Sequence, residues 1–194
     1  MTAIIMAASA WPTNAHLIEA VHQLGYINDE DAVLDPTYGL GKWWSRWKPA
    51  NLVAHDLYTL DGVDFTNLPH GVREFDVVAF DPPYKLNGTG SQPDERYGVH
   101  RYAAWQERHA LIRAGMTECV RVLKPKGRLL VRCQDQVCGG KVRWQTIEFA
   151  NHGHSLGLDL VDTLYRLGSR AQPAGRTQQH ARRNMSALLV FEKP

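Results

Sequence analysis

The strongest constraint on the fold is an alternation of short apolar runs with longer amphipathic stretches. Six short runs are largely apolar: 32–35, 52–55, 75–80, 128–133, 158–167 and 186–191. Between them, residues 13–24 and 102–123 carry apolar side chains at three- and four-residue spacing, which is typical of helices. Several of these runs are too short and too apolar for strands with one exposed face, which predicts strands buried on both faces. The alternation therefore predicts an α/β domain with a parallel sheet.

Chain length and strand order set further limits. A chain of 194 residues suits one domain with a substantial core, here predicted to span residues 1–194, and leaves little room for a second. Only a loop separates the runs 158–167 and 186–191. Because a short connection favours antiparallel neighbours, we expect these two runs to form an antiparallel pair at the edge of the sheet.

Composition excludes several classes of protein. No apolar run approaches the roughly 20 residues that cross a bilayer, so we expect no membrane partner. The N-terminal stretch lacks the basic region of a signal peptide. The three cysteines, Cys119, Cys133 and Cys138, form no Cys-x-x-Cys pair. These features predict a cytoplasmic protein with reduced thiols and no metal site.

A glycine-rich turn follows the first predicted strand and is expected to open a helix. The sequence there is Asp35-Pro36-Thr37-Tyr38-Gly39-Leu40-Gly41. Glycines allow the backbone to turn tightly and to approach a ligand closely. Trp44 occupies the place of the third glycine in a dinucleotide-binding fingerprint, which argues against NAD or FAD. A purely structural turn would look the same.

Acidic residues follow the next two predicted strands. Asp56 lies 21 residues after Asp35, where a carboxylate can accept hydrogen bonds from both hydroxyls of a ribose. Asp64 precedes Phe65 and is expected after a third, short strand, where it could accept a bond from an adenine amino group. Each could equally be an ordinary strand-end or turn residue. Their order and spacing together favour a nucleoside-containing cofactor.

The most informative segment is the buried run 75–80, which leads directly into Asp81-Pro82-Pro83-Tyr84. Two successive prolines fix the backbone and remove two hydrogen-bond donors. The Asp81 carboxylate and the Pro82 carbonyl then form a rigid rim of acceptors. Such a rim suits a planar exocyclic amino group, which has two N–H donors. Tyr84 offers a flat face on which a base can stack.

This order of motifs resembles the class I S-adenosylmethionine-dependent methyltransferases of the amino-methylating group, whose signature is the Asp-Pro-Pro-Tyr tetrad. The resemblance covers residues 11–192. It implies a Rossmann-like α/β fold with a mostly parallel seven-stranded sheet, an antiparallel C-terminal edge pair and helices on both faces. It also implies that the target base is held by the tetrad, Asp81, Pro82, Pro83 and Tyr84.

The same resemblance assigns the cofactor site. Asp35, Gly39 and Gly41 would hold the methionine end of S-adenosylmethionine, Asp56 the ribose and Asp64 the adenine. The adjoining cofactor contacts would come from Pro36, Thr37, Leu57 and Phe65. Methyl transfer from a sulfonium is an in-line displacement, so positioning supplies most of the rate. Bonds from the amino group to Asp81 and to the Pro82 carbonyl would favour the tetrahedral, nucleophilic nitrogen and stabilise its developing charge.

Two loops are expected to face the substrate. Residues 85–100 follow the tetrad and are rich in glycine, so we expect a lid over the bound base. Residues 168–184 are polar and arginine-rich, within a stretch, 163–191, that holds no acidic residue despite a net charge of only +2. Phosphate contacts are therefore expected from Lys85, Arg170, Arg176, His180, Arg182 and Arg183. A solvated charged loop is the alternative.

These features favour a DNA methyltransferase that acts on adenine N6, with the target base flipped out of the duplex. S-adenosylmethionine is the predicted cofactor and nucleic acid the predicted partner, with DNA favoured over RNA. The serious alternative is a ribosomal RNA methyltransferase acting on guanine N2 or adenine N6. A non-catalytic nucleic-acid-binding module on a decayed methyltransferase fold is an alternative of another class, against which the intact tetrad argues. No segment is long enough for a separate recognition domain.

Overall fold

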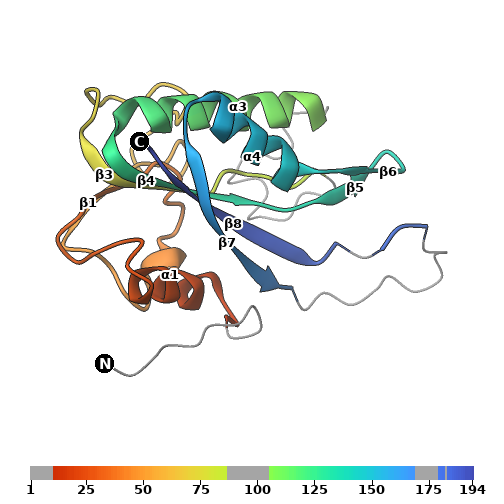
Figure 1. Ribbon diagram of the computed structural model, residues 1–194, viewed down its shortest axis with the longest axis horizontal. Helices are drawn as coiled ribbons and strands as arrows, with labels where there is room; N and C mark the ends of the chain where they lie inside the picture. The colour runs from red at the N-terminus through yellow and green to blue at the C-terminus, as the bar shows by residue number, and fades with distance from the viewer. Residues whose placement is uncertain (1–10, 87–104, 169–178, 182) are drawn as a thin grey trace.

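The computed structural model describes residues 11–86, 105–168, 179–181 and 183–194 (Figure 1). Within these residues, six strands form one sheet in the order β2–β1–β3–β4–β8–β7. Their bounds, in chain order, are β1 (Ala32–Asp35), β2 (Asn51–Ala54), β3 (Phe75–Phe80), β4 (Leu123–Cys133), β7 (Asp159–Leu167) and β8 (Met185–Glu192). The prediction of an α/β domain is confirmed.

The first four strands of the sheet run parallel to one another, whereas β8 runs antiparallel to both of its neighbours, β4 and β7. The predicted antiparallel pair is therefore confirmed. The last strand in the sequence, β8, lies inside the sheet, and β7 forms the edge. Burial follows this order, because all six residues from Ser186 to Phe191 are buried while β7 is largely exposed.

Two apolar clusters lie on opposite sides of the sheet, because successive residues of a strand point to opposite faces. Val78 packs in a cluster with Ile112 of α3 (Trp105–Val122) and Phe149 of α4 (Gln145–Ser155). Val77 packs in the other cluster with residues of α1 (Asn14–Gln23) and of the 3₁₀ turn η2 (Lys42–Trp44). In Figure 1, α3 and α4 accordingly lie across the sheet from α1.

The segment between β2 and β3 differs from the prediction. No strand forms in residues 55–74, so the main sheet has six strands among the described residues rather than seven. Aspartate side chains there bond the backbone N–H groups that a strand would need: Asp56 accepts from Tyr58 and Thr59, and Asp64 accepts from Thr66. Such local turns compete with pairing in a sheet.

Other elements were also predicted wrongly or missed. The glycine turn leads into the three-residue turn η2, not into an α-helix. The sequence pattern did not indicate α4 or a separate hairpin of β5 (Gln136–Cys138) and β6 (Lys141–Arg143). No helix in the described part of the chain is both long and apolar enough to cross a membrane.

Candidate active site

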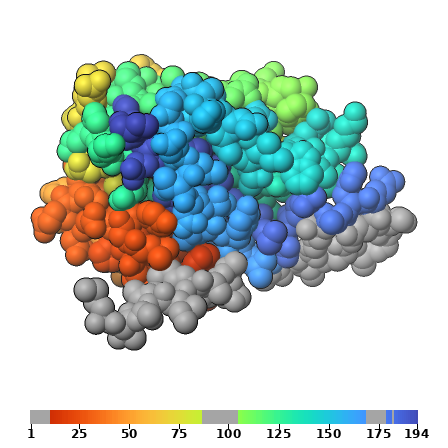
Figure 2. All heavy atoms as spheres, viewed as in Figure 1, coloured from red at the N-terminus to blue at the C-terminus, as the bar shows by residue number. Residues whose placement is uncertain are grey.

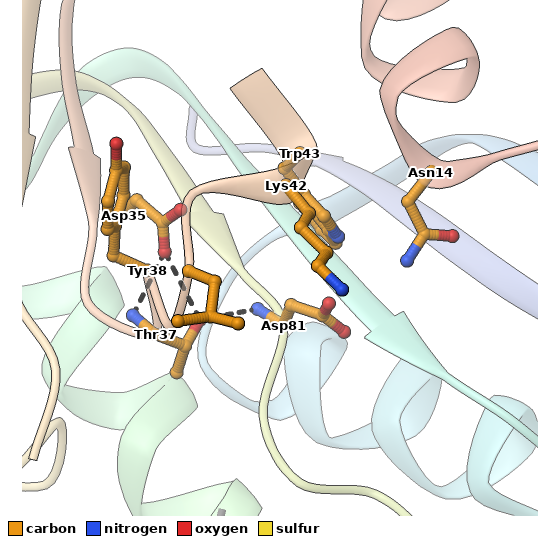
Figure 3. Close-up of a pocket in the computed structure, with 8 residues that line it drawn as sticks. Asn14, Asp35, Thr37, Tyr38, Lys42, Trp43 and Asp81 are labelled. Atoms are coloured by element: carbon orange, nitrogen blue, oxygen red, sulfur yellow. Dashed lines mark hydrogen bonds between the residues drawn. The ribbon is translucent and has the colours of Figure 1, made fainter. Parts of the chain in front are cut away.

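A small cavity lies where β1 and β3, which are neighbours in the sheet, reach their carboxyl ends (Figure 3). Its volume is about 110 Å³, and it is lined by Asn14, Asp35, Thr37, Tyr38, Leu40, Lys42, Trp43 and Asp81. The Thr37 hydroxyl oxygen accepts a hydrogen bond from the Asp81 backbone N–H at 2.8 Å and lies 3.3 Å from Asp35 Oδ1. The structure therefore brings the glycine turn and the tetrad together at one cavity.

Asp35 is a buried carboxyl group that lines this cavity, with 3% of its surface exposed. It accepts hydrogen bonds from the Trp44 indole N–H at 2.7 Å and from the Thr37 backbone N–H at 2.9 Å. Burial raises the pKa of Asp35 to about 7. The bonds from Trp44 and Thr37 oppose this rise in pKa, and the negative charge of Asp81 adds to it.

Asp81 is the second carboxyl group of the cavity. Burial raises its pKa to about 6, while the positive charge of Arg132 and the neighbouring Trp43 indole N–H lower the pKa. Trp43 Nε1 is buried but forms no hydrogen bond of ordinary geometry. In Figure 3 the Lys42 ammonium group extends toward Asp81. The cavity thus holds two carboxyl groups and an unused donor, which suits a ligand that carries both positive and acceptor groups.

The glycine turn is shaped by its own packing. Gly41 has a φ of +66°, and a Cβ there would lie 2.5 Å from the Tyr38 hydroxyl oxygen. The Gly39 backbone N–H donates to Asp56 Oδ2 at 2.9 Å. Pro36 is buried and Thr37 is half-buried, and of these two only Thr37 lines the cavity. The need for glycine at position 41 therefore follows from Tyr38, whatever binds in the cavity.

The structure does not place the predicted ribose and adenine residues at the cavity. Asp56 is buried, and its carboxylate accepts bonds from three backbone N–H groups, those of Gly39, Tyr58 and Thr59. A carboxylate has about four acceptor positions, so Asp56 in this arrangement has at most one left for a ribose. Leu57 is half-buried, Asp64 is exposed, and Phe65 packs in the core; none of the three lines the cavity.

Within the tetrad, Pro82 is buried and Pro83 is half-buried. The Pro82 carbonyl accepts a bond from the Tyr84 backbone N–H at 2.7 Å, which leaves one lone pair for a ligand. Tyr84 packs partly buried against the core cluster that contains α3. Its carbonyl accepts bonds from Gln136 Nε2 at 2.7 Å and from Gln145 Nε2 at 2.8 Å. These two amides hold the end of the tetrad in place.

Sequence reasoning missed these two glutamines and also Arg132. Arg132 is fully buried, and its Nη2 atom bonds to Asn14 Oδ1 at 3.1 Å and to Ser186 Oγ at 2.6 Å. Its Nε and Nη1 atoms have no hydrogen-bond partner in the described structure. An arginine inside an apolar strand run was a visible signal of a special role. The glutamines carried no such signal, since they stand in polar segments.

The predicted phosphate-binding residues are only partly within the described structure. Lys85 follows Tyr84 and is half-buried. A ring nitrogen of His180 lies 2.9 Å from the Gly140 carbonyl oxygen, and the Arg183 guanidinium lies 4.4 Å from the centre of the Trp144 ring. Arg170, Arg176 and Arg182 lie outside the described residues, as do residues 87–100 and 169–178 of the two predicted loops. No metal-binding group of three or more His, Cys, Asp or Glu side chains occurs in the part of the chain described.

No protein-family model matches the sequence, and comparison with curated proteins gives no match. Solved structures do match. A Bacillus halodurans protein provisionally named a methyltransferase has a TM-score of 0.57 at 10% identity, over 91% of this chain and 98% of that one. This chain shares its Rossmann-like α/β fold with that protein.

The same fold also occurs with other chemistry. The [4+2]-cyclase SpnF matches with a TM-score of 0.55 at 14% identity, over 98% of this chain and 87% of that one. A Thermus thermophilus protein provisionally named a DNA modification methylase matches 67% of this chain with a TM-score of 0.43 at 17% identity. This chain spans 48% of the length of that protein. The likenesses therefore define the fold, and the reaction has to be argued from the site.

Proposed function

We propose that this protein is an S-adenosylmethionine-dependent methyltransferase that modifies an exocyclic amino group of a nucleic-acid base, adenine N6 of DNA being the favoured target. The observation that carries the proposal is the junction between the two motifs. Through Thr37, the glycine turn after β1 is bonded to the Asp-Pro-Pro-Tyr tetrad after β3, and one cavity lies between them. A cofactor bound at the turn would therefore lie next to a base held by the tetrad.

The residues of the cavity fit this cofactor. S-adenosylmethionine carries a sulfonium and an ammonium group, and burial has raised the pKa values of both Asp35 and Asp81. A cation bound beside Asp35 would favour the ionised form of that carboxyl group. The buried Trp43 indole N–H lies beside Asp81 without a hydrogen bond of ordinary geometry in the described structure, and it could donate to the carboxylate of the cofactor. Asp35 and Trp43 would thus hold the methionine end.

The tetrad suits an amino nucleophile. When bound, the cofactor supplies an electrophilic methyl group with a good leaving group. The Asp81 carboxylate and the free lone pair of the Pro82 carbonyl would accept the two N–H bonds of the target amine. These bonds hold the amine in line with the methyl group and stabilise the positive charge that develops on nitrogen. The methylated ammonium is acidic and loses its proton to water, so no dedicated base is required.

Methylation of isolated nucleic acid tests the proposal. Purified protein would be incubated with S-adenosylmethionine and, separately, with unmodified DNA and with ribosomal RNA, and the nucleosides analysed by mass spectrometry. We expect N6-methyladenine in DNA. Methylguanosine in ribosomal RNA with unmodified DNA would replace the favoured target by the alternative one.

Two variants locate the reaction. Asp81→Ala should abolish transfer and leave the dissociation constant for S-adenosylmethionine within a fewfold of the wild-type value. Asp159→Ala is the matched control, since Asp159 is exposed and does not line the cavity. A fully active Asp81→Ala protein would refute the catalytic assignment. Absence of S-adenosylmethionine binding to the wild-type protein would favour a non-catalytic module.

A further inference from the structure

The hairpin of β5 and β6 stands apart from the main sheet. The two strands have three residues each and are joined by Gly139 and Gly140, both with positive φ, the backbone form of a tight hairpin turn. An isolated two-stranded hairpin is at best marginally stable in water, so it needs an anchor. The anchor is the tetrad: Gln136 at the start of β5 and Gln145 just after β6 both donate to the Tyr84 carbonyl.

The charged side chains of this hairpin are all basic. Residues 136–147 contain no acidic residue, but they contain Lys141 and Arg143. Arg183 is tied to the same region, because its carbonyl accepts a bond from Gln134 Nε2 at 2.7 Å. Five basic side chains elsewhere are paired with carboxylates: Arg46, Arg113, Arg121, Lys124 and Arg128. Arg143 and Arg183 form no ion pair within the described residues.

Aromatic rings replace carboxylates as the partners of these two arginines. The Arg143 guanidinium lies 4.1 Å from the centre of the Trp105 ring, and that of Arg183 lies 4.4 Å from the centre of the Trp144 ring. The Nε atoms of both arginines are buried without a hydrogen-bond partner. Stacking on an indole holds a guanidinium in one orientation and leaves its positive charge uncompensated.

The surface is open to a partner. Trp144 is 43% exposed, although a tryptophan is usually well buried. Val137 of β5 and Ile147 of α4 are also exposed. Figure 2 shows the turquoise hairpin and the blue residues near 180 at the same end of the molecule. The contact between His180 and the Gly140 carbonyl joins the two segments. Cationic and aromatic side chains are thus interleaved on one surface next to the tetrad.

We propose that this surface, formed by Lys141, Arg143, Trp144 and Arg183, is the docking site for an unpaired stretch of the nucleic-acid substrate. The proposal rests on the function proposed above and names the part of the protein that delivers the base. Phosphates would bind the uncompensated cations, and a base beside the target would stack on Trp144. Because Gln136 and Gln145 tie the hairpin to Tyr84, a strand docked there would lie at the mouth of the tetrad.

Binding of labelled oligonucleotides tests the proposal. Fluorescence anisotropy would give the dissociation constants of single-stranded DNA and RNA oligomers at several salt concentrations. Trp144→Ala should raise the dissociation constant about tenfold, whereas Trp144→Phe, which keeps an aromatic face, should stay within about threefold of wild type. Lys141→Gln should reduce the slope of log K against log salt by about 0.7, the value for one lost phosphate contact on a single strand.

Matched controls separate a docking role from general damage. Val72→Ala removes exposed apolar surface and Lys48→Gln removes an exposed charge, each away from the hairpin, and both should bind like wild type. All variants should retain wild-type affinity for S-adenosylmethionine, because neither Lys141 nor Trp144 lines the cavity. Comparison of the DNA and RNA oligomers identifies the preferred polymer.

The outcomes distinguish the two proposals. Hairpin variants that bind and methylate nucleic acid as well as wild type would overturn the docking surface and leave the proposed function intact. Oligonucleotide binding that depends on Trp144 and Lys141, without methyl transfer to any nucleic acid, would support the surface and overturn the proposed function. A wild-type protein that binds no oligonucleotide would overturn the docking surface.

Discussion

Asp35 should make the protein less stable as the pH rises. Its side chain is almost completely buried, and its pKa is raised from 3.8 to about 7. Between these two values the folded state binds a proton more tightly than the unfolded chain does. The free energy of unfolding therefore falls as the pH rises through this interval and levels off above pH 7. From pH 5.0 to pH 7.5, a shift of this size corresponds to about 2.5 kcal/mol.

Urea unfolding of the wild-type protein and of Asp35→Asn at both pH values measures this contribution. Asparagine does not titrate, so the variant should lack about 2.5 kcal/mol of the pH dependence. The variant also perturbs the bonds from Trp44 and Thr37, but that cost is the same at both pH values and cancels in the comparison. Asp64→Asn, at an exposed position, is the control and should behave like wild type. Equal pH dependence in the wild-type and Asp35→Asn proteins would refute the reasoning.

The affinity for the cofactor should also depend on the ionisation of Asp35. A cation bound beside Asp35 favours the ionised carboxylate, so the affinity for S-adenosylmethionine should rise by up to about tenfold between pH 6 and pH 8. S-adenosylhomocysteine lacks the sulfonium charge and should show a weaker dependence on pH. Isothermal titration calorimetry measures both affinities. With Asp35→Asn, the affinity for S-adenosylmethionine should no longer depend on pH over this range.

Three further predictions concern the tetrad. With a pKa of about 6 for Asp81 in the free protein, kcat/KM should fall about tenfold for each pH unit below 6. A constant kcat/KM from pH 7 to pH 5 would show that the ionised form is not needed. The positive charge of Arg132 lowers the pKa of Asp81. Arg132→Met should therefore shift this loss of activity to higher pH, and Arg132→Lys should return it to the wild-type pH range. Gln145→Leu removes hydrogen bonds to Tyr84 and Gln134. Its free energy of unfolding in urea should therefore fall by about 1–3 kcal/mol, and its kcat should also fall. An unchanged kcat would contradict a positioning role.

Local features of the chain were predictable from sequence. The runs 32–35 and 75–80 coincide with β1 and β3, because a short, largely apolar run is suited to the centre of a parallel sheet. The tetrad was recognisable for a similar reason, since two prolines restrict the backbone whatever surrounds them. By contrast, β4 begins at Leu123, five residues before the predicted run. Residues 124–127, Lys-Pro-Lys-Gly, lie within β4, and the apolar pattern did not show this.

Features that depend on distant parts of the chain were not predictable. Gln136 and Gln145 reach the Tyr84 carbonyl across 52 and 61 residues, and Arg132 reaches Asn14 across 118. Nothing in a local pattern shows which carbonyl a glutamine will meet. The sequence did not predict the hairpin of β5 and β6 because its strands are only three residues long. The hydrogen bonds that anchor it also reach a distant part of the chain, the tetrad.

Asp35 and Asp56 show why residue type and spacing alone do not assign a role. Both follow or end a strand, and both are buried, with 3% and 4% of their surfaces exposed. Asp56 accepts three backbone N–H bonds and thereby holds the glycine turn. Asp35 also accepts three hydrogen bonds, from the Thr37 backbone N–H, the Thr37 hydroxyl and the Trp44 indole N–H. The number of donors therefore does not separate the two residues. Their positions do, because Asp35 lines the cavity with a second carboxyl group nearby and Asp56 does not, so substitution of Asp35 should weaken cofactor binding.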